Sequence, residues 1–278
     1  MHISLIMATI GRTTEVERFL RSLADQTYRD FDLIVVDQND DGRLESILAG
    51  YRDSFHIKHL ISSPGLSKAR NVGLRHVTGD IVGFPDDDCW YDPELLNQTV
   101  HYFREHSIWD GLSGRPVGMD GKTSIGRFDC TDGPIDKFNI WRRVNSNTLF
   151  LSADIIKSVG DFDETLGVGA MTYWGSGEDT DYPLRAIQKG FKLFYLPDII
   201  IRHPHVEAIY NSNTLRKRYL YGAGMGRVLH KHRYPVFFKF YYLIRPLGGA
   251  LLALLCGKID KAMHHLALFR GRMKGLLG

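Results

Sequence analysis

The stretch "DIVGFPDDDCWYDP", residues 80–93, carries the clearest signal of the fold. It begins with an apolar strand signal at residues 80–84 and passes almost at once into three consecutive carboxylates, Asp86, Asp87 and Asp88. Carboxylates this close raise the free-energy cost of ionising one another. The sequence therefore predicts either a solvated acidic turn or a site that holds a positive charge.

Strand and helix signals alternate around this stretch. Helical apolar periodicity marks residues 13–23, 43–51, 66–77 and 93–103, and short apolar runs between them mark strands at 3–8, 31–37, 57–61 and 80–84. This alternation over about 100 residues predicts an α/β fold with βαβ units and a mostly parallel sheet flanked by helices. Ligands bind at the carboxyl ends of such strands, where Asp37 and residues 86–88 fall.

Composition and missing motifs exclude several classes of protein. The chain has 278 residues, of which 44% are hydrophobic and 24% charged, as is ordinary for a globular protein. Its three cysteines form no CxxC pair, which disfavours a zinc ribbon or a disulfide framework and favours a reducing compartment. The N-terminal residues lack the pattern of a signal peptide. The "GKT" at residues 121–123 has Pro116 where a P-loop needs glycine, and no GxGxxG follows the first strand.

The acidic triplet has the chemistry of a site for a hard metal ion. Carboxylate oxygens suit Mg²⁺ or Mn²⁺, and Mg²⁺ usually keeps water and phosphate oxygens among its ligands. An acidic cluster at a strand end therefore predicts an ion that neutralises a bound diphosphate.

Five segments of the chain resemble motifs of the family 2 glycosyltransferases, which have the GT-A fold. They are "ATIGR" (8–12), "SLADQTYRDFDLIVVDQND" (22–40), "GLSKARNVGLRHVTGDIVGFPDDDCWYDP" (65–93), "GDFDETLG" (160–167) and "GSGEDTDYPLRAIQKGF" (175–191). Their order and spacing make the resemblance specific over residues 1–205. It implies a Rossmann-like GT-A catalytic domain with a nucleotide-sugar-binding half (1–110) and an acceptor and catalytic half (111–205).

The resemblance implies contacts to a nucleotide-sugar donor. Thr9, Arg12 and Asp37 would surround the nucleobase and ribose. The family often places Asp after the Asp37 position, where this chain has Gln38, whose carbonyl oxygen can still accept a uracil N–H. The remaining implied contacts are Arg70 at the diphosphate, Asp86 or Asp87 at the ribose, and Asp88 at the metal ion, with His203 as a further candidate near the ion or the diphosphate.

The same resemblance implies a catalytic base in the segment "GSGED". Inverting transfer needs a base that takes the proton of the acceptor hydroxyl. Asp179 is the preferred base, and Glu178 is either the alternative base or a residue that orients the acceptor. A structural alternative is that both are acids favoured by the helix dipole at a helix start. Trp174 is an expected acceptor contact, with a place in the core as its alternative.

Charge is distributed unevenly along the chain. Residues 202–278 carry a formal charge of +12 and residues 1–201 carry −9. The apolar run at 236–256 is interrupted by Lys239, Arg245 and Pro246, which predicts an interfacial segment, and 258–278 reads as a basic amphipathic helix. Residues 206–278 are therefore predicted to be a helical extension that lies on an anionic membrane, or alternatively helices packed on the catalytic domain. RNA-binding motifs are missing, so no nucleic-acid partner is expected.

The preferred hypothesis is an inverting glycosyltransferase assisted by Mn²⁺ or Mg²⁺. It would move a sugar from a nucleotide-sugar donor, with UDP favoured, to a polysaccharide or lipid-linked glycan, at the cytoplasmic face of the cell membrane. A sugar-nucleotide nucleotidyltransferase is one alternative, but "ATIGRTTEVERF" (8–19) is a poor version of its Gly-rich basic loop. A non-catalytic, membrane-bound carbohydrate-binding protein is another, and the presence of Asp88 and Asp179 disfavours it.

Overall fold

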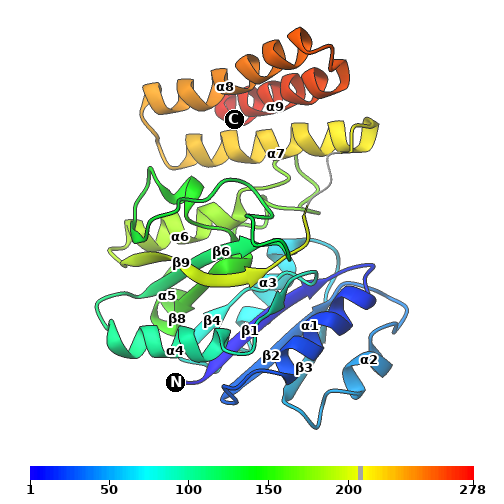
Figure 1. Cartoon of the computed structure of the whole chain (residues 1–278), viewed down its shortest axis with the longest axis vertical. Helices are drawn as coiled ribbons and strands as arrows, with labels where there is room; N and C mark the ends of the chain where they lie inside the picture. Colours follow the sequence, from blue (N-terminus) through cyan, green and yellow to red (C-terminus); the bar gives the residue numbers. More distant parts are fainter. Residues whose placement is uncertain (206–208) are drawn as a thin grey trace. The chain divides into compact units, whose positions relative to one another are not determined.

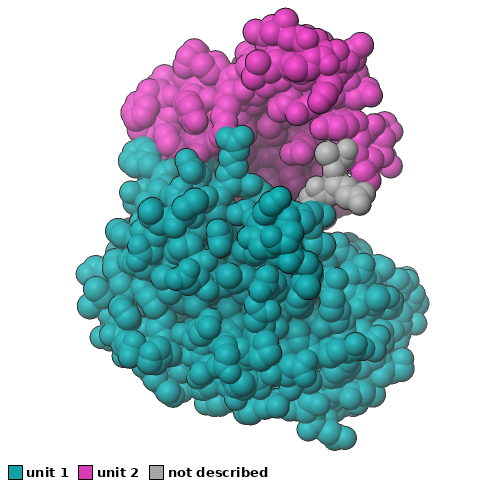
Figure 2. Space-filling view, viewed as in Figure 1, with its two compact units in different colours: residues 1–64, 68–162, 182–206 teal, residues 65–67, 163–181, 207–278 magenta. Residues whose placement is uncertain are grey.

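The computed structural model describes residues 1–205 and 209–278 of the chain. These form two compact units (Figure 2), the first from residues 1–64, 68–162 and 182–205, the second from 65–67, 163–181 and 209–278. The predicted division at residue 205 stays a prediction, and the first residues of the predicted extension, 206–208, lie outside the described part.

Unit 1 is built on a mixed sheet (Figure 1). Among the described residues it has nine strands in the order β3-β2-β1-β4-β8-β6-β9-β5, with β7 pairing with β9. The strands are β1 (Ile3–Thr9), β2 (Phe31–Asp37), β3 (His56–Ile61), β4 (Ile81–Gly83), β5 (Trp90–Tyr91), β6 (Gly111–Val117), β7 (Gly133–Ile135), β8 (Leu149–Ser152) and β9 (Leu193–Arg202).

The N-terminal half of the sheet is parallel, as the sequence predicts. β1 pairs in parallel with β2 and β4, and β2 with β3. Every residue of β2 is buried, as expected for a parallel strand covered on both faces. The other half is mixed: β6 runs parallel to β9, whereas β8 runs antiparallel to β4 and β6, and β5 and β7 run antiparallel to β9. The predicted α/β fold, a sheet flanked by helices, is confirmed, and parallel pairing dominates in the N-terminal half of the sheet.

Helices flank this sheet, and their apolar sides supply the core. They are α1 (Thr14–Ala24), α2 (Glu45–Ala49), α3 (Leu66–Leu74), α4 (Leu95–Glu105), α5 (Ala153–Val159) and α6 (Glu178–Gln188). In α1 the buried apolar residues are Val16, Phe19, Leu20 and Leu23, the face expected from their helical spacing. These residues pack into the core beside the sheet. Because β1 pairs in parallel with β2 and β4, the C-terminal ends of the three strands lie along one edge of the sheet.

Unit 2 contains three long helices, α7 (Ser212–Lys231), α8 (Val236–Leu255) and α9 (Ile259–Leu277). Glycines bring the backbones of α7 and α9 into direct contact. A Cβ atom added to Gly275 would lie 2.0 Å from the carbonyl oxygen of Ala223, and one added to Gly271 would lie 2.1 Å from that of Tyr219. Residues without a Cβ are therefore required at this interface.

Residues 258–278 form a helix as predicted, but its packed face is not made by the large apolar residues. α9 buries Ala262, His264, Gly271, Arg272 and Gly275, whereas Ile259 and Leu277 are exposed. The large apolar residues exposed on α8 and α9 are Val236, Phe237, Phe240, Tyr241, Ile244, Leu247, Leu251, Leu252, Leu254, Leu255, Ile259, Met263, Leu266 and Leu277. α8 is long and apolar enough, by length and composition, to cross a membrane, and it continues unbroken through Lys239, Arg245 and Pro246.

Substitution of Gly275 by leucine is expected to separate α9 from α7. The new side chain would collide with backbone atoms that cannot rotate away, and overpacking of this kind costs about 1–3 kcal/mol or more. Thermal unfolding followed by circular dichroism should show a lower midpoint. The matched control is Gly248→Leu, because a Cβ at Gly248 meets nothing within 4 Å. Equal midpoints for the two variants would contradict the close contact.

Candidate active site

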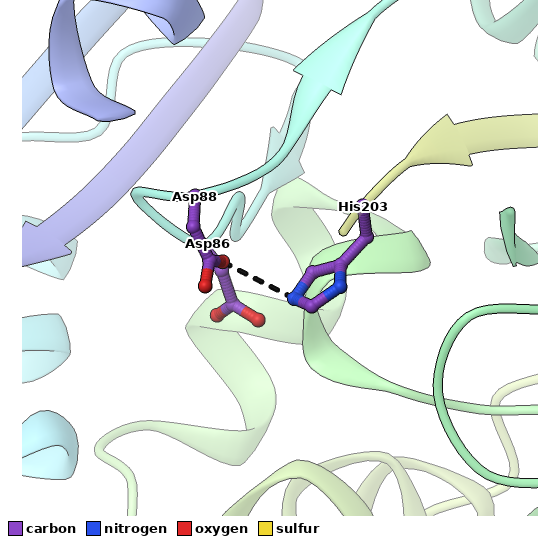
Figure 3. Close-up of side chains that lie close together, drawn as sticks. All are labelled: Asp86, Asp88 and His203. Carbon is purple, nitrogen blue, oxygen red and sulfur yellow. Dashed lines mark ion pairs between the residues drawn. The ribbon is translucent and has the colours of Figure 1, made fainter. Parts of the chain in front are cut away.

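Three potential metal-ligating side chains converge at the edge of the sheet in unit 1 (Figure 3). Asp86 and Asp88 lie in the loop between β4 and β5, and His203 directly follows β9. β5 pairs with β9 so that Trp90 faces Arg202, which brings residues just before β5 close to the residue just after β9. One ligand atom from each of the three residues lies within 4.8 Å of the others.

Hydrogen bonding fixes the orientation of His203. Its Nδ1 lies 2.6 Å from the carbonyl oxygen of Pro204. A carbonyl oxygen only accepts, so Nδ1 carries the proton and Nε2 is the nitrogen that faces Asp88 Oδ1, 3.2 Å away. In the neutral ring the lone pair of Nε2 would point at a carboxylate. A proton or a metal ion between these two atoms relieves that repulsion, so the arrangement fits a bound cation.

The charges around Asp88 favour its ionised form. Burial disfavours the charge, but the hydrogen bond with His203 and the nearby charge of Arg12 together lower the pKa of Asp88 to about 2. Burial likewise disfavours a charged His203, but the Asp88 carboxylate outweighs it and raises the pKa of the imidazole. Asp88 is thus a carboxylate at any physiological pH, which is the form that binds metal ions.

The middle carboxylate of the triplet faces another partner. Arg12 Nη1 lies 2.6 Å from Asp87 Oδ1 and 2.7 Å from Asp88 Oδ2. Burial raises the pKa of Asp87 to about 6, although Arg12 and Thr9 act in the opposite direction. Asp86 and Asp88 face His203, and Asp87 and Asp88 share the positive charge of Arg12. These partners offset the repulsion among the three adjacent carboxylates.

Arg70 is a buried cation beside the triplet. It is 2% exposed, its Nη2 lies 2.8 Å from Ser146 Oγ, and the same nitrogen is 3.5 Å from Asp86 Oδ1. Asn147 Nδ2 donates to the other oxygen of Asp86 at 3.1 Å. Ser146 and Asn147 belong to a short 3₁₀ helix before β8. Sequence analysis missed both, because "NSNT" is indistinguishable from an ordinary polar turn.

Asp37 ends β2 with both carboxylate oxygens hydrogen-bonded. Oδ1 accepts from the backbone and side-chain nitrogens of Asn39, at 2.9 and 2.6 Å, and Oδ2 lies 3.1 Å from His59 Nε2. Gln38 Nε2 donates to the carbonyl oxygen of Thr9 at 3.3 Å. The predicted nucleoside-binding residues at the ends of β1 and β2 are therefore neighbours held by local hydrogen bonds.

The predicted catalytic residues lie in unit 2. Glu178 and Asp179 are the first two residues of α6, and Glu178 is buried. The ring of Trp174 packs under the guanidinium of Arg227 on α7, at 4.3 Å, so this side chain has a structural partner.

A partly buried network of ion pairs and hydrogen bonds links residues 163–181 to the C-terminal end of α7, and no local sequence pattern predicted it. Asp181 Oδ1 lies 2.8 Å from Lys231 Nζ and 2.7 Å from His232 Nε2, and Lys231 also reaches Asp163 Oδ2 at 2.7 Å. Ser176 Oγ donates to the carbonyl oxygen of Tyr221 at 2.9 Å. The backbone N–H of Gly175 also donates to the carbonyl oxygen of Leu220 at 3.2 Å, so residues on both sides of Glu178 are anchored to α7 or to His232 just after it.

Comparison with known proteins identifies the family. The profile described as "Glycosyl transferase family 2" matches residues 4–154, more than half of the chain. The chain belongs to glycosyl transferase family 2. This glycosyltransferase is therefore an enzyme of nucleotide-sugar-dependent transfer, as predicted, and the family match disfavours both the nucleotidyltransferase and the non-catalytic alternatives.

Several relatives and solved structures resemble this glycosyltransferase. Glycosyltransferase AglE of Haloferax volcanii is 24% identical over 95% of this chain and 84% of its own length. The pre-mycofactocin glycosyltransferase of Mycobacterium tuberculosis is also 24% identical over 95% of this chain, which spans only 54% of that relative.

Solved structures confirm the GT-A fold of this glycosyltransferase. Residues 1–349 of Staphylococcus aureus TarS match with a TM-score of 0.65 and 18% identity, covering 98% of this chain and 92% of that one. The mannosyltransferase PcManGT of Pyrobaculum calidifontis, in complex with GDP-Man and Mn²⁺, matches with a TM-score of 0.68 and 14% identity, covering 99% and 87%. The roles of individual residues stay predictions.

Proposed function

We propose that this glycosyltransferase binds a nucleotide sugar at the carboxyl ends of β1, β2 and β4 and transfers the sugar, with inversion, to a polysaccharide or lipid-linked glycan. The observation that carries the proposal is the group formed by Asp86, Asp88 and His203 beside the buried Arg70. Complexes of proteins with this fold contain UDP-GlcNAc and GDP-Man, which supports a nucleoside-diphosphate donor. UDP is favoured, because the Gln38 carbonyl can accept the uracil N–H.

Asp88 and His203 would hold Mn²⁺ or Mg²⁺, with Asp86 close enough to share the ion or to contact the ribose. Two carboxylates and one imidazole form a donor set that Mn²⁺ accepts readily. The bound ion would offset negative charge on the leaving diphosphate. Arg70, beside Asp86, is positively charged like the metal ion. Its guanidinium would contact the diphosphate directly.

Asp179 would act as the general base for the transfer. As the bond from the acceptor oxygen to the anomeric carbon forms, the bond from that carbon to the diphosphate oxygen breaks, and the acceptor proton passes to Asp179. The nucleoside diphosphate leaves with the electron pair of the broken bond. Glu178 would orient the acceptor, and Trp174 would present a ring face to its sugar.

The helices of unit 2 would bind the anionic inner face of the cell membrane. The exposed apolar residues of α8 and α9 are accompanied by Lys239, Arg245, Lys258, Lys261 and Lys274, whereas Asp260 is the acid of these two helices. Basic residues near an anionic leaflet contribute about 1 kcal/mol each, and exposed apolar side chains add insertion. This would place the enzyme where a soluble donor and a lipid-linked acceptor meet.

A donor screen tests the proposed reaction. Nucleotide sugars with uridine and guanosine are incubated with the enzyme and Mn²⁺, and the released nucleoside diphosphate is measured by mass spectrometry. We expect release that depends on Mn²⁺ and is fastest with a UDP-sugar. Faster release from a GDP-sugar would overturn the assignment of Gln38, and release of pyrophosphate or monophosphate instead would overturn the proposed transfer.

A further inference from the structure

A groove runs between α7 and α9 at the N-terminal halves of both helices. Its volume is about 460 Å³. Each helix contributes four lining residues at i, i+3, i+4 and i+7 spacing, which places them on one face over two turns. The residues that matter below are Leu215, Arg216 and Tyr219 on α7 and Met263, Leu266 and Arg270 on α9.

The two helices run in parallel, and their register is fixed by contacts. Thr214 Oγ1 lies 2.9 Å from His264 Nε2, and Gly271 packs against the backbone of Tyr219. Arg216 is therefore level with about residue 266, and Arg270 lies about one helical turn, roughly 5 Å, further along the opposite wall. Two long side chains this far apart can converge on one small anion in the groove.

The groove carries positive charge from Arg216 and Arg270. Both guanidinium groups are exposed, and among residues 1–205 and 209–278 no acidic side chain pairs with either of them. The lining itself contains no Asp or Glu. Arginine forks bind phosphate oxygens through paired N–H···O bonds, so the groove complements a phosphate group.

The floor of the groove is apolar and continues onto a larger exposed apolar surface. Met263 and Leu266 line the groove and are themselves partly exposed, and Ile259 lies one turn before Met263 on the same side of α9. A ligand with a phosphate at the arginines would therefore have apolar surface available for a hydrocarbon chain. A free phosphate ion would contact the arginines but would leave the apolar surface uncovered.

From these observations we infer that the α7–α9 groove is a specific site for the phosphate head group of an anionic membrane phospholipid, held by Arg216 and Arg270 with its acyl chain along Met263 and Leu266. The inference rests on the proposed membrane association and adds a discrete lipid site to it. It assigns two basic residues a function distinct from that of the other basic residues on α8 and α9.

Calorimetry with a short-chain phosphatidic acid, kept below its micelle concentration, tests the site without a membrane surface. We expect saturable one-to-one binding to the full-length enzyme, weakened at least about tenfold in Arg216→Gln/Arg270→Gln, equivalent to 1.4 kcal/mol. The matched control, Lys258→Gln/Lys261→Gln, removes the same charge outside the groove and should bind as the wild type does. Circular dichroism confirms that both variants are folded.

Two further arms separate the sources of phosphate and the two proposals. Inorganic phosphate should bind much more weakly than the short-chain lipid, and equal affinity would overturn a lipid as the ligand. Sedimentation with phosphatidylcholine vesicles containing phosphatidylglycerol tests membrane binding itself. Vesicle binding together with a calorimetric lipid affinity that is unchanged in Arg216→Gln/Arg270→Gln would overturn the groove but keep the membrane. Lipid binding in calorimetry without vesicle binding would overturn the membrane proposal alone.

Discussion

Replacing Asp179 with asparagine is expected to lower kcat by about a hundredfold or more while donor affinity stays unchanged. Asparagine keeps the shape of the side chain but cannot take the acceptor proton. The measurement is the initial rate of nucleoside-diphosphate release at saturating donor, together with calorimetric donor affinity.

Asp154→Asn is the matched control for this variant. Asp154 is also an acid in the first turn of a helix, α5, so the change removes a comparable interaction with a helix dipole. Its turnover should remain close to that of the wild type. If Asp179→Asn also turned over at the wild-type rate, Asp179 would be, like Asp154, a helix-start acid of no catalytic importance. Glu178 would then become the candidate base.

Replacing Asp88 with alanine is expected to abolish metal-dependent binding of a nucleoside diphosphate. Loss of a direct ligand should exceed the roughly 10- to 100-fold cost of losing an outer partner of a metal site. Arg12 keeps Asp87 as a partner in this variant, so the loop retains one of its two ion pairs with Arg12. Calorimetry with and without Mn²⁺ measures the effect.

Asp92→Ala provides the comparison. Asp92 directly follows β5, and its ion pair with Arg202, the last residue of β9, at 2.8 Å, is lost in this variant, whereas Asp86, Asp88 and His203 are unchanged. It should leave the response to Mn²⁺ intact. An unchanged nucleoside-diphosphate affinity of Asp88→Ala in the presence of Mn²⁺ would show that the ion is bound elsewhere.

Sequence alone predicted the parts of the fold that have long apolar runs. β1 and β2 are seven residues each, and five of the seven in each strand are apolar, so their signals were clear. β5, β7 and β8 have only two to four residues, too few for a periodic pattern, and these strands make the antiparallel pairs of the sheet.

The sequence predicted which residues form the candidate site. It did not predict which side chains of the site face one another. The acidic triplet and His203 both follow apolar runs, which marks them as residues at strand ends. Which carboxylate faces Arg12 and which faces His203 depends on the turn after β4 and on the register of β5 with β9. Neither is encoded in a local pattern.

The packing of α7 against α9 could not be predicted from the sequence for a different reason. Hydrophobic periodicity detects large side chains, and none of the large apolar side chains of α9 is fully buried. The contact with α7 uses Gly271 and Gly275, whose signal is the absence of a side chain.

Close approach on two sides of α7 has a practical consequence for preparing the enzyme. A Cβ atom on Gly226 would lie 2.3 Å from the carbonyl oxygen of Arg272, and one on Gly224 would lie 2.1 Å from that of Ser176, two residues before Glu178. Deleting α9 to improve solubility would strip one side of the helix that holds the loop of the proposed base. Polar replacements at exposed positions such as Leu252 and Leu255 would reduce aggregation and leave that support in place.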